Sequence, residues 1–190
     1  YRQRYLDLIS NEDARYTARM RSSVVAALRS FMTDRGFLEV ETPILVPIAA
    51  GGAAHPFTTH HSQLNRELYL RIATELHLKR LIVGGLERVF EVGRIFRNEG
   101  VDHYHNPEFT TMESYEAFAD YSDVMEMVEE MIYAICLKVT GSESIQWENM
   151  TLNFKPPWPR VSLREQIIGA TGIDFLEYPE IETLRGAMSK

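Results

Sequence analysis

The sequence has little cysteine, no long apolar segment and no excess of positive charge. Its only cysteine is Cys136, so no disulfide can form within the chain, and we expect a protein of the reducing cytoplasm. No apolar run approaches the roughly 18 residues that span a bilayer, so no membrane partner is expected. The net charge of −7 gives no electrostatic footprint for nucleic acid. An RNA partner would have to be held outside this chain, or only at its end.

The composition is that of a folded domain. Hydrophobic residues make up 45% of the 190 residues and charged residues 25%, enough for one domain with a sizeable core. The chain starts at Tyr1 without an initiator methionine and stops at Lys190 without an obvious terminating element. We therefore expect a piece of a larger protein.

Helices and antiparallel strands in mixed order predict an α+β fold. Apolar residues spaced by three and four predict helices from a cap at Ser10, Asn11 or Asp13 to Gly36, from residue 75 to Gly84 and Gly85, and from a cap at Ser122 to Gly141. Expected strands are FLEVETPIL, which Pro43 ends, ELYLRI, and two long alternating segments, residues 88–98 and 108–118. A loop covers PIAAGGAAHPF, and another strand, a proline-rich break and a short helix follow residue 147.

The two long strands divide their side chains between two faces, because residues of equal parity point the same way. Arg94, Glu108 and Glu116 lie on one face. The other carries Glu91, Gly93, Ile95, Arg97, Glu99, Phe109, Thr111, Glu113, Tyr115 and Ala117. One of these polar faces must be covered or must bind a ligand. The spacing alone leaves open that the second face is simply the solvated side of a half-buried sheet.

The second face has the chemistry to bind phosphate, a base and an ammonium group. Arg97 offers a planar fork of donors for phosphate or carboxylate oxygens. Phe109 is a flat apolar platform on which a nucleobase can stack. Carboxylates and the phenol of Tyr115 can receive the ammonium groups of a small cation. Gly93 leaves room for something to lie close to the backbone.

These segments resemble a known family. FRNEG, HNPEF and FTTMESYEAFADY closely resemble motif 2 of the class II aminoacyl-tRNA synthetases in its lysyl form, about residues 88–118. RSSVVAALRSFMTDRGFLEVETPIL resembles motif 1, about residues 14–47, which builds the homodimer interface of that family. The resemblance implies an antiparallel sheet flanked by helices. Residues 1–190 would be the N-terminal half of the catalytic domain, with motif 3 and the anticodon-binding domain outside them.

The resemblance also implies roles in binding ATP. Arg97 would hold the α-phosphate together with the carboxylate of the amino acid. Glu99 would accept a hydrogen bond from the adenine amino group, and Phe109 would stack on the adenine. His105 and Asn106 belong to the loop that clamps the nucleotide, with His105 towards the triphosphate.

For the amino acid, the resemblance implies a lysine site. Glu75 and Glu113 would bind the α-ammonium group, with the backbone near Gly51 close by, and Tyr115 would reach the ε-ammonium group. Lysine would be activated to lysyl-adenylate and transferred to tRNA(Lys). Mg²⁺ would be held by carboxylates outside this chain, and the 190 residues alone are expected to be inactive.

Several alternatives remain at this stage. Glu75 at a helix start can simply compensate the helix dipole. His60 and His61 are adjacent, so on a strand they point apart and are not expected to bind a metal. A tyrosine before His105, here Tyr104, resembles the sequence of a paralogue that lysylates elongation factor P. Ala73 and the segment GGAA resemble the sequence of the enzyme that acts on tRNA. A dimerisation module without catalytic activity is the other alternative.

Overall fold

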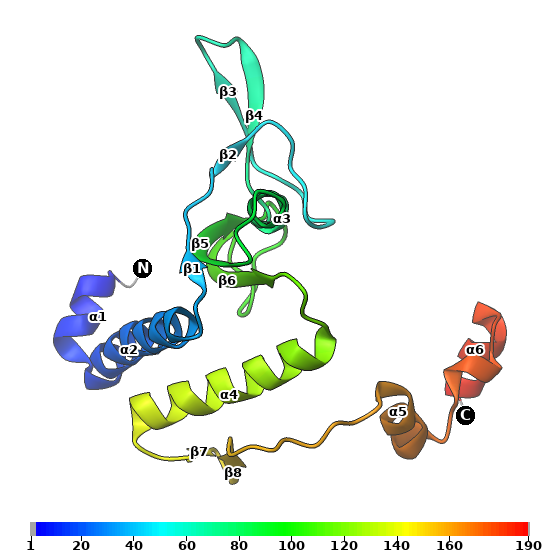
Figure 1. Ribbon diagram of the computed structural model, residues 1–190. Coiled ribbons are helices and arrows are strands. Elements are labelled where there is room, and N and C mark those ends of the chain that lie inside the picture. Colours follow the sequence, from blue (N-terminus) through cyan, green and yellow to red (C-terminus); the bar gives the residue numbers. More distant parts are fainter. Residues whose placement is uncertain (1–2, 190) are drawn as a thin grey trace. The chain divides into compact units, whose positions relative to one another are not determined.

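The structure is a computed structural model that describes residues 3–189 and divides into two units, residues 1–154 and residues 155–190. The helices of the first unit are α1 (Arg4–Ser10), α2 (Glu12–Asp34), α3 (Glu75–Val83) and α4 (Tyr121–Thr140) (Figure 1). Its strands are β1 (Leu38–Glu39), β2 (Leu45–Val46), β3 (Thr58–His61), β4 (Arg66–Leu70), β5 (Arg88–Phe96), β6 (Glu108–Glu116), β7 (Ser144–Trp147) and β8 (Met150–Asn153). The mixture of helices and largely antiparallel sheets confirms the α+β class.

The first helical segment begins earlier than its sequence pattern predicted. Arg4–Ser10, which precede the expected cap at Asn11, form the short helix α1. Asn11 then caps α2, because its side-chain oxygen accepts hydrogen bonds from the backbone N–H groups of Asp13 at 3.0 Å and Ala14 at 3.4 Å. The helix ends two residues before Gly36, whose φ of 81° turns the chain out of the helix. One of the three candidate caps and the predicted end are confirmed.

The sheet that matters for the site has the order β1-β5-β6. In the antiparallel pair β5–β6, Glu91 lies opposite Glu113 and Ile95 lies opposite Phe109. Residues that face each other across a ladder share a face, so the predicted division by parity is confirmed. The expected strand over residues 37–45 is wrong as a single element. Its ends form β1, parallel to β5, and β2, in the second sheet, with Pro43 in the break between them.

Helices α2 and α4 cover the face of β5–β6 that carries the even-numbered residues (Figure 1). The core on this side consists of Met32, Phe37, Phe90, Met127 and Met131, all of them buried. The charged residues of the same parity lie towards the ends of the strands and form exposed ion pairs, Arg88 with Glu116 and Arg94 with Glu108. Cys136 of α4 is buried as a core residue, as its apolar surroundings in the sequence predicted. Helices α2 and α4 therefore cover this face. On the opposite face Val89, Glu91 and Ile95 of β5 are also buried, so only its β6 residues and the segment that follows β5 are partly exposed to a ligand.

The N-terminus of α4 is capped by Asp120 and not by Ser122. Asp120 has extended backbone angles, and its side chain accepts from the N–H groups of Ser122 at 2.7 Å and Asp123 at 3.3 Å. The side chain of Asp123 accepts in return from the N–H of Asp120 at 2.7 Å, which completes a capping box. The sequence suggested Ser122 because the apolar spacing does not show that Tyr121 already belongs to the helix.

We expect Asp120→Ala to weaken the first turn of α4 by about 1 kcal/mol, the usual cost of losing such a cap. Ser122→Ala is the matched control and should cost less than about 0.5 kcal/mol, as exposed substitutions usually do. Hydrogen exchange of the first amides of α4, measured by mass spectrometry on the full-length protein, gives the local opening free energy. A larger loss for Ser122→Ala than for Asp120→Ala would contradict the assignment.

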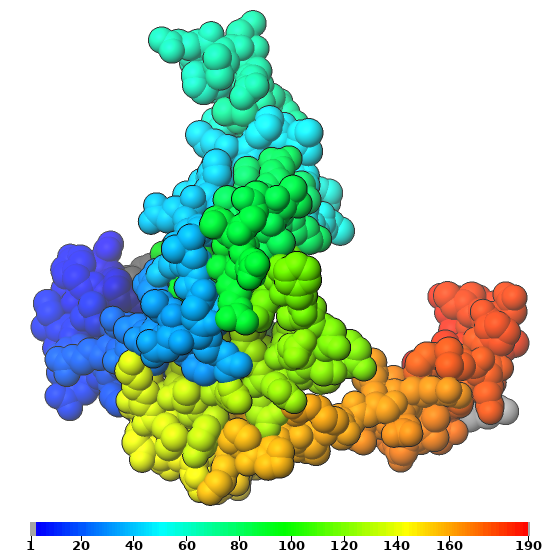
Figure 2. Space-filling view, viewed as in Figure 1, coloured from blue at the N-terminus to red at the C-terminus, as the bar shows by residue number. Residues whose placement is uncertain are grey.

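The remaining strands form two small sheets. β3 and β4 form a hairpin that also pairs with β2, and this hairpin projects from the main sheet (Figure 2). β3 was not predicted, whereas β4 matches the expected strand. β7 and β8 form a hairpin with a turn at Glu148, where a single strand was expected.

The second unit contains α5 (Leu163–Thr171), the 3-10 helix η1 (Phe175–Glu177) and α6 (Ile181–Met188). Ser162 caps α5, and Gly172 ends it in the left-handed conformation. Arg164 of α5 forms an ion pair with Asp174, which holds the start of η1 against the helix. The predicted short helix after the proline-rich segment is confirmed. Within residues 3–189, no helix has the length and apolar character that crossing a membrane requires.

Candidate functional site

The candidate site occupies the face of β5–β6 that α2 and α4 leave free. α3 lies over one end of this face, where the backbone N–H of Thr74 donates to Oε1 of Glu113 at 3.3 Å. At the other end the chain leaves β5 and returns through residues 97–107. The backbone N–H of Arg97 donates to the carbonyl of Pro107 at 2.9 Å, so the ladder extends one step beyond the two strands. Arg97 is therefore placed by backbone hydrogen bonding, although its side chain is exposed.

Arg97 and Phe109 form one wall of a pocket of about 280 Å³. The guanidinium carbon of Arg97 lies 5.4 Å from the centre of the Phe109 ring, within the range of a cation–π contact. No acidic side chain among the described residues forms an ion pair with Arg97, so its charge is available to a ligand. The pocket residues are Arg97, Glu99, Gly100, Tyr104, His105, Asn106 and Phe109. The structure thus brings together all five residues that were predicted to bind the nucleotide.

A cluster of acids lies at the other end of the same face. Glu75 is the first residue of α3, and Glu113 and Tyr115 project from β6 on the same side. The pKa of Tyr115 is raised, first by burial and then by the charges of Glu75 and Glu113. Glu75 and Glu113, which are expected to bind the α-ammonium group, therefore lie close to Tyr115, which is expected to reach the ε-ammonium group.

The loop before β3 approaches this cluster at Gly51. Gly51 has φ of 94°, and a Cβ built there would lie 2.7 Å from Cβ of Ala73 and 3.2 Å from Cβ of Glu75. Both the backbone angle and the lack of space therefore require glycine. The backbone of Gly51 is the part of this loop that lies next to Glu75, in agreement with the expected proximity.

Lys79 is a member of the cluster that the sequence patterns did not identify. Its Nζ lies 2.5 Å from Oε1 of Glu75 and 5.9 Å from the centre of the Tyr115 ring. Its pKa is raised, mainly by the hydrogen bond to Glu75 and by the charge of that group. The chain's own ammonium group therefore occupies part of the predicted ammonium site. The signal in the sequence is the spacing of four between Glu75 and Lys79 on one helix face.

The space beside Gly93 is filled by the protein itself, so the expectation that a ligand lies there is wrong. A Cβ at Gly93 would collide with Nη2 of Arg71 and lie 2.9 Å from Oε1 of Glu91. Arg71 follows β4, is only 3% exposed, and its Nη1 lies 2.6 Å from Oε1 of Glu91. The hydroxyl of Thr42 donates to the second oxygen of Glu91 at 2.6 Å.

The same guanidinium group ties three segments of the chain together. Its Nε donates to the carbonyl of Arg94 in β5 at 2.9 Å, and its Nη1 donates to the carbonyl of Thr42 at 3.0 Å. The backbone carbonyl of Arg71 accepts from the N–H of Phe96 at 3.0 Å. Arg71 and Glu91 are therefore a buried structural pair beneath the site. Period-2 alternation predicted the face of Glu91 but could not supply its partner.

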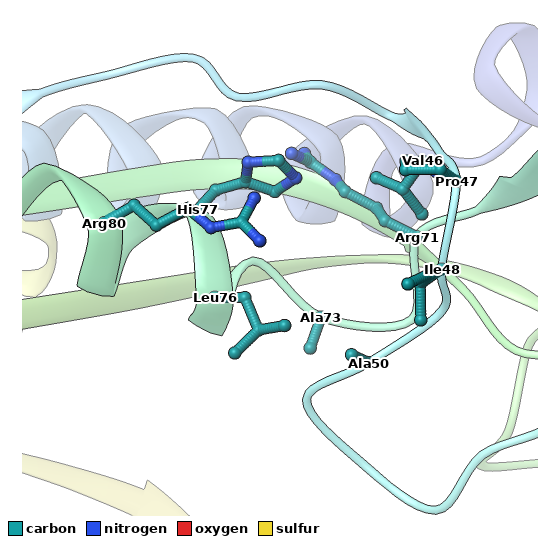
Figure 3. A pocket seen from close by; sticks show the side chains of 9 residues that line it. All are labelled: Val46, Pro47, Ile48, Ala50, Arg71, Ala73, Leu76, His77 and Arg80. Atoms are coloured by element: carbon teal, nitrogen blue, oxygen red, sulfur yellow. The ribbon is translucent and has the colours of Figure 1, made fainter.

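A separate pocket of about 110 Å³ lies between α3 and residues 46–50 (Figure 3). Arg71, His77 and Arg80 reach into it, and apolar side chains such as Val46 and Ile48 form its other walls. In Figure 3 the His77 ring lies between the two arginine side chains. None of the residues predicted to bind a ligand lines this pocket.

No metal site is apparent in the part of the chain that the structure describes. Residues 3–189 contain no group of three or more His, Cys, Asp or Glu side chains that could hold a metal ion. His60 and His61 are consecutive residues of β3, and Nδ1 of His61 accepts from the backbone N–H of Leu64 at 3.3 Å. This local bond gives His61 a structural role in the turn after β3.

Comparison with known proteins gives a consistent result. The profile of the family "tRNA synthetases class II (D, K and N)" matches residues 1–178. The chain is 57% identical over 188 residues to a lysine–tRNA ligase of Dehalococcoides mccartyi and 56% identical over 188 residues to one of Roseiflexus castenholzii, in both cases over 99% of this chain. A lysine–tRNA ligase of Clostridium novyi is 54% identical over 185 residues, 97% of this chain. The chain spans 38% of the length of the first two relatives and 36% of the third.

Proposed function

The chain belongs to the class II tRNA synthetases of the D, K and N group, and we propose that the full-length protein activates lysine with ATP and transfers it to tRNA(Lys). The observation that carries this proposal is the register of β5 and β6. It gives Phe109, which lines the pocket of about 280 Å³, the same face of β6 as Glu113 and Tyr115. We also propose that the protein forms a homodimer through residues 14–47. Its proposed site of action is the cytoplasm.

The geometry supports an adenylation reaction in which the protein provides no nucleophile. A carboxylate oxygen of lysine attacks the α-phosphorus of ATP, the bond from that phosphorus to the bridging oxygen breaks, and pyrophosphate leaves. Arg97 stands where it can bind the lysine carboxylate and the α-phosphate together, so it aligns the two and stabilises the charge that develops between them. Phe109 provides the surface for the adenine ring. Mg²⁺ enters this proposal only as the ion that accompanies ATP.

In the second step, a hydroxyl group at the 3′ end of the tRNA attacks the carbonyl carbon of lysyl-adenylate. The bond from that carbon to the phosphate oxygen breaks, and AMP leaves. The net charge of −7 does not favour binding of this chain to the phosphates of the tRNA body. We therefore propose that this chain contacts only the 3′ end of the tRNA.

The acid cluster supports lysine among the three amino acids of the group. Glu75, Glu113 and Tyr115 present two carboxylates and a phenol, which suit ammonium groups and repel the side-chain carboxylate of aspartate. The contact between the ammonium group of Lys79 and Glu75 supports the choice of an ammonium ligand. The relatives are named as lysine–tRNA ligases, so we favour this function over lysylation of elongation factor P.

We expect Glu75→Gln to weaken lysine binding about 10- to 100-fold, since a hydrogen bond to a charged group contributes about 1.5–3 kcal/mol. The dissociation constant of a non-hydrolysable ATP analogue should change less than about twofold, because Glu75 lies outside the nucleotide pocket. Calorimetric titration of the full-length protein with each ligand measures both values.

Glu116→Gln is the matched control for this experiment. Glu116 ends β6 on the face opposite to Glu113 and Tyr115, where it pairs with Arg88, so neither dissociation constant should change. If Glu75→Gln weakened the binding of both ligands equally, Glu75 would not be part of the lysine site.

A further inference from the structure

The loop between β5 and β6 is organised by one carboxylate, that of Asp102. Its Oδ1 accepts hydrogen bonds from the backbone N–H groups of Tyr104 at 2.7 Å and His105 at 2.8 Å. Its Oδ2 lies 2.7 Å from Nδ1 of the His105 ring. A single side chain therefore fixes both the turn of the backbone and the ring of a residue that lines the nucleotide pocket.

The hydrogen bonds of Asp102 favour its ionised form. Its pKa is lowered, mainly by the backbone hydrogen bond from Tyr104 and then by the hydrogen bond from the His105 ring. The folded loop therefore gains stability from this group above the ordinary pKa of aspartate, and loses it as the pH falls through the lowered value. At neutral pH the carboxylate is a permanent negative charge beside the ring.

The contact at Nδ1 determines what the other ring nitrogen can do. A carboxylate can only accept a hydrogen bond, so the contact puts a proton on Nδ1 of His105. When the ring is protonated, Nε2 carries a second N–H group, and the imidazolium ion can donate it to a phosphate oxygen. Such a charge-assisted bond is roughly twice as strong as one from a neutral donor.

We propose that Asp102 is a positioning residue that holds the ring of His105 with Nε2 towards the β- and γ-phosphates of ATP, to which the imidazolium form of the ring donates a hydrogen bond. The inference rests on the proposed function and goes beyond it, because it assigns a role to a residue that touches neither substrate. Asp102 acts through His105: it fixes the orientation of the ring, and its charge balances the second proton.

The simpler alternative is that Asp102 only shapes the loop. The two roles separate in Asp102→Asn, because the amide oxygen of asparagine still accepts the N–H groups of Tyr104 and His105 and so retains the turn. The amide nitrogen, however, donates to Nδ1, which leaves a neutral ring with its proton on Nε2. The substitution therefore removes the negative charge beside the ring and the proton on Nδ1, and it retains the loop.

The test compares two nucleotides on the full-length protein by calorimetric titration. A non-hydrolysable ATP analogue carries the β- and γ-phosphates, whereas AMP shares only the α-phosphate and the adenosine. We expect Asp102→Asn to raise the dissociation constant of the ATP analogue about fivefold, which corresponds to the difference between a charge-assisted and a neutral hydrogen bond. The dissociation constant of AMP should change less than about twofold. In a His105→Ala background, Asp102→Asn should have no further effect on either nucleotide.

Two outcomes overturn the inference while leaving the proposed function intact. One is an Asp102→Asn protein that binds the ATP analogue as tightly as the unmodified protein does. The other is a loss that is equal for ATP analogue and AMP, or that persists in the His105→Ala background, because either would mean that Asp102 acts on the loop alone. If the unmodified protein binds no ATP analogue at all, the proposed function itself fails, and this inference fails with it.

Discussion

Arg97→Ala lowers lysine-dependent ATP–pyrophosphate exchange by the full-length protein by several orders of magnitude. Removal of even one donor to a developing transition-state charge costs about 10²–10³ in rate, and Arg97 is assigned to two reactants at once. Its guanidinium group forms no ion pair among the described residues, so no internal role competes with binding the ligands. Exchange of labelled pyrophosphate into ATP, measured at saturating lysine and ATP, gives the rate.

Arg94→Ala is the matched control. Arg94 lies three residues earlier on β5 and on the opposite face, where it forms a 3.4 Å ion pair with Glu108 and both side chains are 53% exposed. An exposed pair of this kind contributes about 0–1 kcal/mol, so exchange should remain near that of the unmodified protein. Arg97→Lys keeps the charge but loses the fork of donors, so its exchange rate should lie between those of Arg97→Ala and Arg94→Ala. If Arg97→Ala lowered the exchange rate less than about threefold, Arg97 would have a structural role and not a catalytic one.

The arrangement of the candidate site was predictable because it depends on a strict period of two. Parity alone put Glu113 and Tyr115 on one face with Arg97, and the register of β5 and β6 confirms it. Side-chain chemistry then indicated which ligands such a face suits. The resemblance to a family gave the individual roles, which alternation cannot supply.

Other features were not predictable, because they depend on contacts between distant segments. Gly93 suggested space for a ligand, but the space is occupied by Arg71, which lies 22 residues earlier in the sequence and follows β4 of another sheet. The break of the expected strand near Pro43 likewise depends on which sheet each end can join. The capping role of Asp120 was missed for a local reason, since helix boundaries shift easily by one or two residues.

Short-range pairs form a third group, because they were present in the sequence but carried no distinctive pattern. Glu75 and Lys79 are four residues apart, and Asp102 and His105 are three apart, which is common among charged residues. Both pairs are partly exposed to solvent, and only the structure shows which other groups they contact. The first faces Tyr115, and the second joins a side chain of the nucleotide pocket to a turn of the backbone.

The buried pair of Arg71 and Glu91 connects the segment of Thr42 with the strand that carries Arg97. Both side chains are almost completely buried, at 3% and 4% exposure, and each is satisfied by further hydrogen bonds, to Thr42 and to the carbonyl of Arg94. Burying two charges costs a large desolvation energy, which their mutual attraction offsets only when the geometry is good and the other polar atoms are satisfied. The pair is therefore most sensitive to the loss of one partner.

We expect Glu91→Ala to destabilise β5–β6 by about 3–5 kcal/mol, because it leaves the Arg71 guanidinium buried and unpaired. The double variant Arg71→Met, Glu91→Leu should cost much less, since it replaces both charges with apolar groups. Hydrogen exchange of the β5 and β6 amides in the full-length protein measures the opening free energy. Glu39→Ala is the control: Glu39 pairs with Arg29 at 2.8 Å, but both are about two-fifths exposed, so its loss should cost less than about 1 kcal/mol. Equal costs for Glu91→Ala and Glu39→Ala would show that burial of the pair has no energetic consequence.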